Sequence, residues 1–182
     1  EHEITVVDTP GYPDFVAEMI QGFHAADAAL FVMDVSGGIE SGLEAAVKTG
    51  RSTGTAACFV LNKCDRENAD PGAALDALRA AFGNKVAPLH LAIGAADTFS
   101  GYVDLVHRKA YRFDGGTEVE IPIPAELADE VARRRDQLLE AAAEADDAVF
   151  EKYLGEEEIS DAELDACLHK GVRESILAPV LV

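Results

Sequence analysis

Several features that define common protein classes are missing from this chain. No apolar run approaches the ~20 residues needed to span a membrane, so we expect no membrane-spanning segment. The acidic start, Glu1-His2-Glu3, is unlike a secretory signal peptide. The three cysteines form no C-x-x-C pattern, which favours reduced thiols in a cytoplasmic protein. The five histidines are scattered without metal-ligand spacing, so no metal cluster is predicted.

Basic residues are also scarce. The chain has 15 Lys and Arg against 34 Asp and Glu, a formal net charge of −19. This charge repels phosphate backbones, so we expect no direct nucleic-acid binding by this chain. Eleven carboxylates and one lysine lie between Glu140 and Asp165. We interpret this stretch as a solvated helical face, with a docking surface for a basic or helical partner as the alternative. The short run Arg133–Arg135 is expected to form internal ion pairs.

What is present, in the first third, is an alternation of strand and helix patterns. The predicted strands are Ile4–Val7, Ala28–Val35 and Thr55–Leu61. The later two are nearly continuous in apolar residues, as strands buried on both faces are. Apolar residues at helical spacing predict helices over about 14–25, around 43–47 and over about 75–82. Three successive strand–helix units predict a parallel sheet with right-handed crossovers.

After residue 84, short strands separated by glycines predict a small antiparallel or mixed sheet. They are expected at Val86–Ile93, Tyr102–Val106, Lys109–Phe113 and Glu118–Ile123. Helices are then expected at about 125–145, 147–154 and 160–173, where Ser160 and Glu163 fit a capping box. The final run, 178–182, has the pattern of a strand. Its apolar end suggests the edge of a larger protein.

Two short motifs directly follow predicted strands. Asp8-Thr9-Pro10-Gly11 follows the first strand, and Asn62-Lys63-Cys64-Asp65 follows the third. In an open parallel sheet, ligands bind at the carboxyl ends of the strands, so we expect both motifs to face one rim. Each motif alone could be an ordinary turn at a strand exit. Their order and their spacing by two strand–helix units together predict a guanine-nucleotide site.

The chemistry of these side chains suits GTP with Mg²⁺. Asp8 is placed to hold Mg²⁺ through water, and the backbone of Gly11 can approach a γ-phosphate closely. Asp65 can accept two hydrogen bonds from guanine, the Lys63 stem can cover the base, and Asn62 can tie neighbouring loops together. The predicted GTP-binding residues are Asp8, Thr9, Pro10, Gly11, Tyr12, Asn62, Lys63 and Asp65. A G-x-x-x-x-G-K-[ST] phosphate loop does not occur in the chain.

Beyond these motifs, the sequence resembles the translational GTPases, and specifically elongation factor G. The stretches that carry this resemblance are Leu91–Gly94, Asp97–Leu105, Lys109–Tyr111, Ile121–Pro124 and Lys152–Leu154, together with the two motifs. The resemblance implies an α/β fold, with a partial P-loop GTPase-type parallel sheet that has helices on both faces and an inserted α+β subdomain. It implies a partial GTP-binding domain at 1–84, the inserted subdomain at 85–177 and a returning strand at 178–182.

The resemblance also implies a function. The family hydrolyses GTP on the ribosome during translation elongation, and its inserted subdomain faces the ribosomal stalk protein. The phosphate loop and first switch are then expected before Glu1, and a base-holding S-A motif after Val182. The family has a histidine after D-T-P-G that positions the attacking water, whereas this chain has Tyr12. Tyr12 is therefore the candidate catalytic residue. The alternatives are a Tyr12 that only packs beside Phe15, a ribosome-associated paralogue, and a GTP-sensing module with slow or no hydrolysis.

Overall fold

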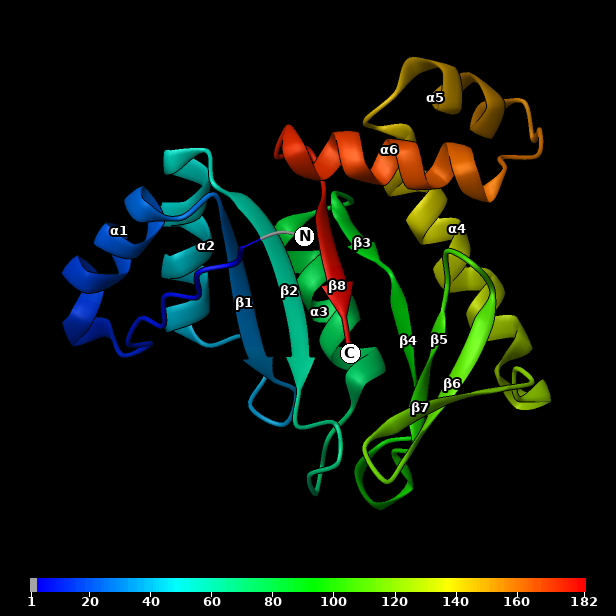
Figure 1. Cartoon of the computed structure of the whole chain (residues 1–182), viewed down its shortest axis with the longest axis horizontal. Coiled ribbons are helices and arrows are strands. Elements are labelled where there is room, and N and C mark those ends of the chain that lie inside the picture. Colours follow the sequence, from blue (N-terminus) through cyan, green and yellow to red (C-terminus); the bar gives the residue numbers. More distant parts are fainter. Residues whose placement is uncertain (1–2) are drawn as a thin grey trace.

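The computed structural model describes residues 3–182, so the predicted start at Glu1 and His2 lies outside the described residues. Its first sheet, sheet A, is parallel throughout and has the order β1-β2-β8-β3. Its strands are β1 (Ala28–Asp34), β2 (Ala56–Asn62), β8 (Ala178–Leu181) and β3 (Val86–Pro88). The last strand of the chain therefore returns between two earlier ones, as Figure 1 shows. The predicted α/β fold with a parallel sheet is confirmed.

Three helices lie in the first part of the chain, one before β1 and one after each of β1 and β2. They are α1 (Val16–Ala25, preceded by the 3₁₀ turn η1, Pro13–Phe15), α2 (Ser41–Thr53) and α3 (Pro71–Phe82). The start of α3 is set locally, because the Asp70 carboxylate accepts the Ala73 N–H at 2.9 Å and Pro71 occupies the first turn. Gly54 ends α2 in a left-handed conformation, with φ of 73°. Both signals lie outside the predicted spans of about 43–47 and 75–82, and both helices are longer than the apolar spacing predicted.

An aromatic row forms the core between sheet A and these helices. The ring of Phe31 lies 6.0 Å from Phe23 and 5.3 Å from Phe59, and the Phe59 ring stacks on Phe82 at 5.6 Å. Figure 1 shows α2 and α3 behind the sheet, and none of the described residues forms a helix over the opposite face. Leu30 and Val32 on that face are 66% and 59% exposed. β1 is thus buried on one face only, although burial on both faces was predicted. The helices likewise cover one face of the sheet, although helices on both faces were predicted.

The predicted strand Ile4–Val7 is not formed. Residues 3–11 have no regular secondary structure, and Ile4 and Val6 are each 83% exposed. A β-branched run becomes a strand only when a neighbouring strand accepts its backbone hydrogen bonds. Within residues 3–182, β1 pairs with β2 alone, and no strand pairs with residues 4–7.

The second sheet, sheet B, is an antiparallel meander in the order β4-β5-β6-β7. Its strands are β4 (His90–Ile93), β5 (Gly101–Asp104), β6 (Lys109–Asp114) and β7 (Thr117–Ile121), with the 3₁₀ turn η2 (Ala96–Thr98) between the first two. The turn η3 (Ala125–Leu127) leads into α4 (Ala128–Ala143), α5 (Asp147–Leu154) and α6 (Asp161–Arg173). The predicted capping box of α6 is present, because Ser160 Oγ accepts the Glu163 N–H and Glu163 accepts the Ser160 N–H.

The segment expected as one strand at Val86–Ile93 is divided between the two sheets. Pro88 ends β3, and Leu89 joins the sheets through its own peptide groups. The Leu89 N–H donates to Val180 O at 3.0 Å in sheet A, and Leu89 O accepts the Leu105 N–H at 2.9 Å beside sheet B. The change of sheet therefore falls at Leu89. The periodicity of a continuous apolar run could not show this division.

Ion pairs hold α4 against α3. The Arg134 side chain is fully buried and bonds to Asp76 of α3, to Glu130 at 2.7 Å and to the Gly72 carbonyl at 3.2 Å. Arg79 of α3 reaches Glu140 of α4 at 2.8 Å. The expected internal pairing of the arginine run 133–135 is confirmed. Across residues 3–182, no helix is both long and apolar enough to cross a membrane.

Candidate functional site

The candidate site lies at the carboxyl ends of β1 and β2. Asp34 is the last residue of β1 and lies in register with Asn62, the last residue of β2. The Val35 N–H donates to Asn62 O at 3.2 Å, so the two strands stay joined to their ends. The second motif begins where this pairing stops. This is the rim at which open parallel sheets bind ligands.

Local hydrogen bonds fix both the backbone and the side chain of Lys63. Its φ is 63°, an uncommon value for a residue other than glycine, and its N–H donates to Asn62 Oδ1 at 2.9 Å. The Lys63 Nζ donates to Asp34 Oδ2 at 2.6 Å across the strand ends. Ser36 donates to the other oxygen, Oδ1, from Oγ at 2.6 Å and from its N–H at 3.1 Å.

This bonding fixes the charge of Asp34. Hydrogen bonds from Lys63, and then from Ser36, hold the pKa of the Asp34 carboxyl well below its usual range. Asp34 is therefore an anion at neutral pH that keeps the lysine amine at the rim. The sequence interpretation missed Asp34. The available signal was a single carboxylate near the end of the apolar run 28–35.

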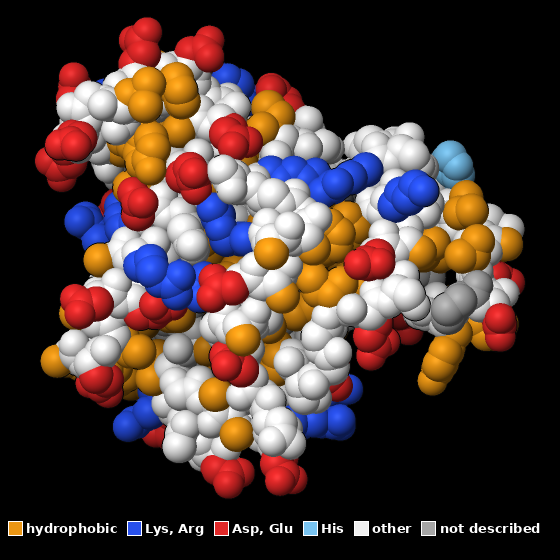
Figure 2. Space-filling view, turned by 180° about the vertical axis from the view of Figure 1, so that it is seen from behind, with side chains coloured by type: hydrophobic (Ala, Val, Ile, Leu, Met, Phe, Trp, Pro, Cys, Tyr) orange, Lys and Arg blue, Asp and Glu red, His pale blue; other side chains and the backbone are white. Residues whose placement is uncertain are grey.

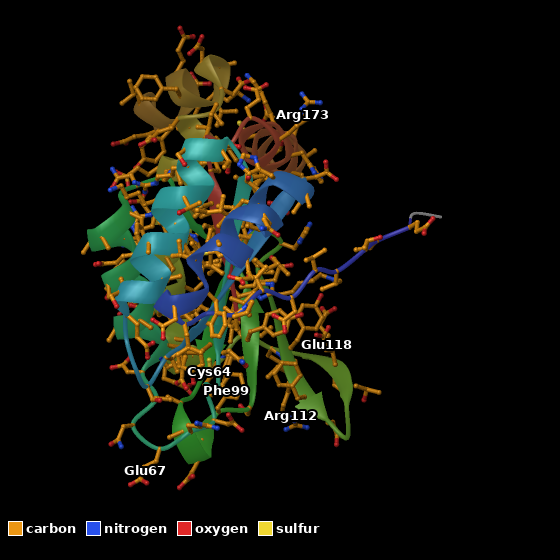
Figure 3. All side chains as sticks on the ribbon, turned by 90° about the vertical axis from the view of Figure 1, so that its left-hand side faces the viewer. Cys64, Glu67, Phe99, Arg112, Glu118 and Arg173 are labelled. Atoms are coloured by element: carbon orange, nitrogen blue, oxygen red, sulfur yellow. The ribbon has the colours of Figure 1, made fainter. Side chains whose placement is uncertain are left out.

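Cys64 anchors the loop that carries Asp65. Its side chain is buried with a thiol 3.4 Å from Leu61 O, and burial, followed by the charge of Asp65, raises its pKa to about 11. The Cys64 carbonyl accepts the Ala96 N–H at 2.8 Å, which joins this loop to η2. Figure 3 shows Cys64 beside Phe99, with Glu67 pointing outward from the same loop.

Asp65 itself is exposed, and no hydrogen bond joins its carboxylate to another side chain or backbone group of residues 3–182. Both oxygens therefore remain able to accept hydrogen bonds from a ligand. Next to it, Lys63 presents a four-carbon stem whose end is held by Asp34. A flat, uncharged ring with two adjacent N–H groups fits this combination.

The first motif lies along α1 and the start of α2. A side chain at Gly22 would meet the Thr9 methyl at 2.6 Å, and one at Gly42 would meet the Gly11 carbonyl oxygen at 3.0 Å. These two glycines allow the Thr9 side chain to lie close to α1 and the Gly11 backbone to lie close to α2. A hollow of about 170 Å³ is lined by Pro10, Gly11, Tyr12, Val16, Met19, Ser41, Gly42 and Ala45.

Tyr12 lies at the mouth of this hollow. Its side chain is 77% exposed, while its carbonyl accepts the Phe15 N–H at 3.0 Å. The contact with Phe15 is therefore made by the backbone, and the phenol faces outward. The alternative in which Tyr12 only packs beside Phe15 does not describe this arrangement.

The two motifs are not joined by any hydrogen bond or ion pair among residues 3–182. The structure brings Asn62, Lys63 and Asp65 together and leaves the first motif as an irregular segment beside α1 and α2. In the described part of the chain, no group of three His, Cys, Asp or Glu side chains is placed to bind a metal ion. Asp8 is exposed. A single accessible carboxylate fits Mg²⁺, which binds through one or two carboxylates together with water and phosphate oxygens.

An open parallel sheet with this rim defines a nucleotide-binding α/β domain, and comparisons with known proteins identify the family. The model for the elongation factor Tu GTP binding domain matches residues 1–168. This chain belongs to that family of translational GTPases. A solved structure from Thermus thermophilus is similar over 96% of this chain, with 36% sequence identity and a TM-score of 0.83. This chain spans 26% of the Thermus chain's length. The predicted resemblance to elongation factor G-like GTPases is confirmed.

Proposed function

We propose that this chain forms part of the GTP-binding domain of an elongation factor G-like ribosomal GTPase that acts in translation elongation. The observation that carries the proposal is the arrangement at the end of β2. There, Asp65 is exposed and unbonded while Lys63 is held by Asp34. We assign the GTP-binding domain to 1–84 and 178–182, and an inserted subdomain to 85–177.

In this proposal the second motif selects guanine. Asp65 accepts hydrogen bonds from N1 and the N2 amino group of the base. Adenine has no such pair of donors at these positions, so it is rejected because the carboxylate would be left unpaired. The Lys63 stem covers the base, and Asn62 keeps the Lys63 backbone in its left-handed conformation through the bond at 2.9 Å.

The first motif serves the phosphates. Asp8 would hold Mg²⁺ through water, and the Gly11 N–H would meet the γ-phosphate, with Thr9 and Pro10 setting the path of the backbone. When Mg²⁺ is bound, it neutralises part of the phosphate charge. Tyr12 would lie near the attacking water, where a neutral phenol can orient it by hydrogen bonding but cannot become a cation.

The proposed partners are the ribosome and, through the inserted subdomain, the ribosomal stalk protein, in the cytoplasm. On α5, Phe150 and Leu154 are 45% and 66% exposed. They lie within the acidic stretch from Glu140 to Asp165. Exposed apolar side chains within an acidic surface suit a helical partner with basic and apolar residues.

Single-turnover GTP hydrolysis by the protein, with and without ribosomes, tests the proposal. We expect ribosomes to accelerate hydrolysis, and equal rates under both conditions would contradict an elongation-type function. The exposed phenol of Tyr12 favours one second candidate, a GTP-sensing module with slow or no hydrolysis. A Tyr12→His variant separates the two. A higher rate in this variant means that Tyr12 limits the chemistry, whereas an unchanged rate means that it does not.

A further inference from the structure

A second cavity lies at the opposite end of sheet A from the nucleotide rim. It has a volume of about 100 Å³ and lies between α2, α3 and the amino-terminal ends of the strands. Apolar side chains form its floor, chiefly Phe31, Val47, Phe59, Phe82 and Leu177. None of the residues in the two sequence motifs lines it. The proposed GTP site therefore leaves this cavity unexplained.

Two basic side chains lie at its mouth. Arg51 of α2 donates from Nη2 to the Phe82 carbonyl at 3.1 Å, and its guanidinium carbon lies 5.5 Å from the Phe82 ring centroid. Lys85, just before β3, also lines the cavity. Figure 2 shows the molecule from behind, with basic side chains gathered at the upper end of an apolar hollow. The phenylalanine contacts fix the guanidinium in place, so the mouth is already organised.

These two cations have no carboxylate partner among residues 3–182, which is unusual in so acidic a chain. Eleven of the fifteen Lys and Arg side chains have a carboxylate within 4.0 Å. The others are Lys48, Arg51, Lys85 and Arg112, of which Lys85 alone is half-buried. Burial, and then the nearby charge of Arg51, lowers the pKa of Lys85. Like charges placed together beside an apolar cavity are stabilised by an anion.

We propose that this cavity binds a small organic carboxylate with a short apolar tail. The carboxylate would lie between Arg51 and Lys85, and the tail would occupy the apolar floor. Thr55 and Ser175 also line the cavity. A volume of about 100 Å³ is smaller than the ~150 Å³ cavity that is known to hold benzene, so it admits a tail of only a few carbons.

The size and the charge together select this ligand class. A nucleotide or a peptide helix is too large for the cavity. A neutral apolar molecule would leave both cations unpaired, and inorganic phosphate or acetate would leave the phenylalanine floor uncovered. Butyrate satisfies both requirements and serves as the probe, with 1-butanol as the neutral molecule of the same tail length.

Amide shifts in two-dimensional NMR, recorded during a butyrate titration of the protein without nucleotide, test the proposal. We expect saturable shifts centred on Thr55, Lys85 and Ser175, and much weaker effects from 1-butanol, acetate and inorganic phosphate. Lys85→Met keeps the length of the side chain and removes its charge, so it should weaken butyrate binding by about tenfold. Lys48→Met is the matched control. It removes an exposed charge on α2 outside the cavity and should leave the affinity unchanged.

A third variant tests the floor independently of charge. Ala57→Leu would fill part of the cavity and should weaken butyrate binding while leaving both cations in place. Equal shifts from butyrate and 1-butanol would overturn the proposal, as would undiminished binding by Lys85→Met. Binding of inorganic phosphate as tight as that of butyrate would show that the tail contributes nothing, and would also overturn it.

Discussion

Lys63 Nζ and Asp34 Oδ2 lie 2.6 Å apart, and this ion pair joins the ends of two adjacent parallel strands. The pair connects a residue of the N-K-x-D motif with a carboxylate that the motif does not include. Both side chains are partly exposed, at 38% and 29%. Its contribution to the free energy of unfolding is therefore small. Its importance lies in fixing where the lysine stem runs.

Asp34→Asn should accordingly weaken nucleotide binding more than it weakens the fold. The neutral amide keeps the hydrogen-bonding shape but loses the charge attraction for Lys63. We expect GTP affinity to fall by roughly tenfold, because the Lys63 stem would no longer be held against the base. Titration with a fluorescent GTP analogue measures this change. Ser36→Ala is the control, since it removes the hydroxyl bond to the same carboxylate and keeps both the backbone bond and the ion pair. A larger loss in the control than in Asp34→Asn would contradict the assignment.

Asp65→Asn should change base preference. An amide presents one acceptor and one donor in place of two acceptors, so it can no longer receive both guanine N–H groups. We expect GTP affinity to fall by about a hundredfold, and xanthosine triphosphate, which has an oxygen at position 2, to bind better than GTP. Competition between the two nucleotides measures the preference. Glu67→Gln, an exposed carboxylate on the same loop in Figure 3, should leave the preference for GTP intact.

Arg134→Ala should destabilise the protein. The guanidinium is buried, yet its partners Asp76 and Glu130 are 51% and 31% exposed and can regain water. The loss in free energy of unfolding is therefore smaller than for a fully buried pair. We expect about 2–3 kcal/mol, and the midpoint of urea unfolding measures it. Arg133→Ala removes the neighbouring, half-exposed arginine and should cost less than about 1 kcal/mol. Similar losses in both variants would show that burial of Arg134 is unimportant.

The stability contributed by His107 should depend on pH. Its Nδ1 lies 2.7 Å from Asp104 Oδ2 and its Nε2 lies 3.6 Å from Asp165, on α6. The bond to Asp104 raises the pKa of His107, with added attraction from Asp165 and Asp161. Because the folded state prefers the protonated ring, the contribution is complete below the unfolded pKa of about 6.5 and disappears as the pH rises through the folded value.

The measurement is the difference in urea midpoint between the wild type and His107→Gln. We expect the wild type to be more stable at about pH 5 and the two proteins to converge at about pH 8. His90 acts in the opposite direction, because burial lowers its pKa and favours the neutral ring. His90 is present in both proteins, so its effect cancels in the difference between their urea midpoints. A difference that grows with pH would contradict the assignment.

The sequence was sufficient where local signals and tertiary packing agree. The capping pair that starts α6 was predicted from residue types alone. Asp70 and Pro71 at the start of α3, and Gly54 at the end of α2, are local signals of the same kind that the prediction from apolar spacing did not use. Strand pairing was harder, because an apolar run does not reveal which edge of a sheet it joins. Residues Ile4–Val7 have the composition of a strand and no pairing partner among residues 3–182.

At the candidate site, motif spacing supplied the proposed base-binding residues but not the carboxylate that holds Lys63 in place. Asp34 lies 29 positions before Lys63, and only the parallel register of β1 and β2 places the two together. Such a contact depends on topology, which the spacing of one motif does not contain. The same reason explains why the cavity beneath Arg51 and Lys85 was not predicted, since its lining comes from separate segments of the chain.

Leu89 has a mechanical consequence for the protein. Its peptide N–H is bonded on the side of sheet A, and its carbonyl is bonded on the side of sheet B. A rotation of one sheet against the other at this residue would have to break a backbone bond on one side or the other. A displacement of the meander would therefore act first on the bond to Val180 of β8, the strand that pairs with β2 of sheet A.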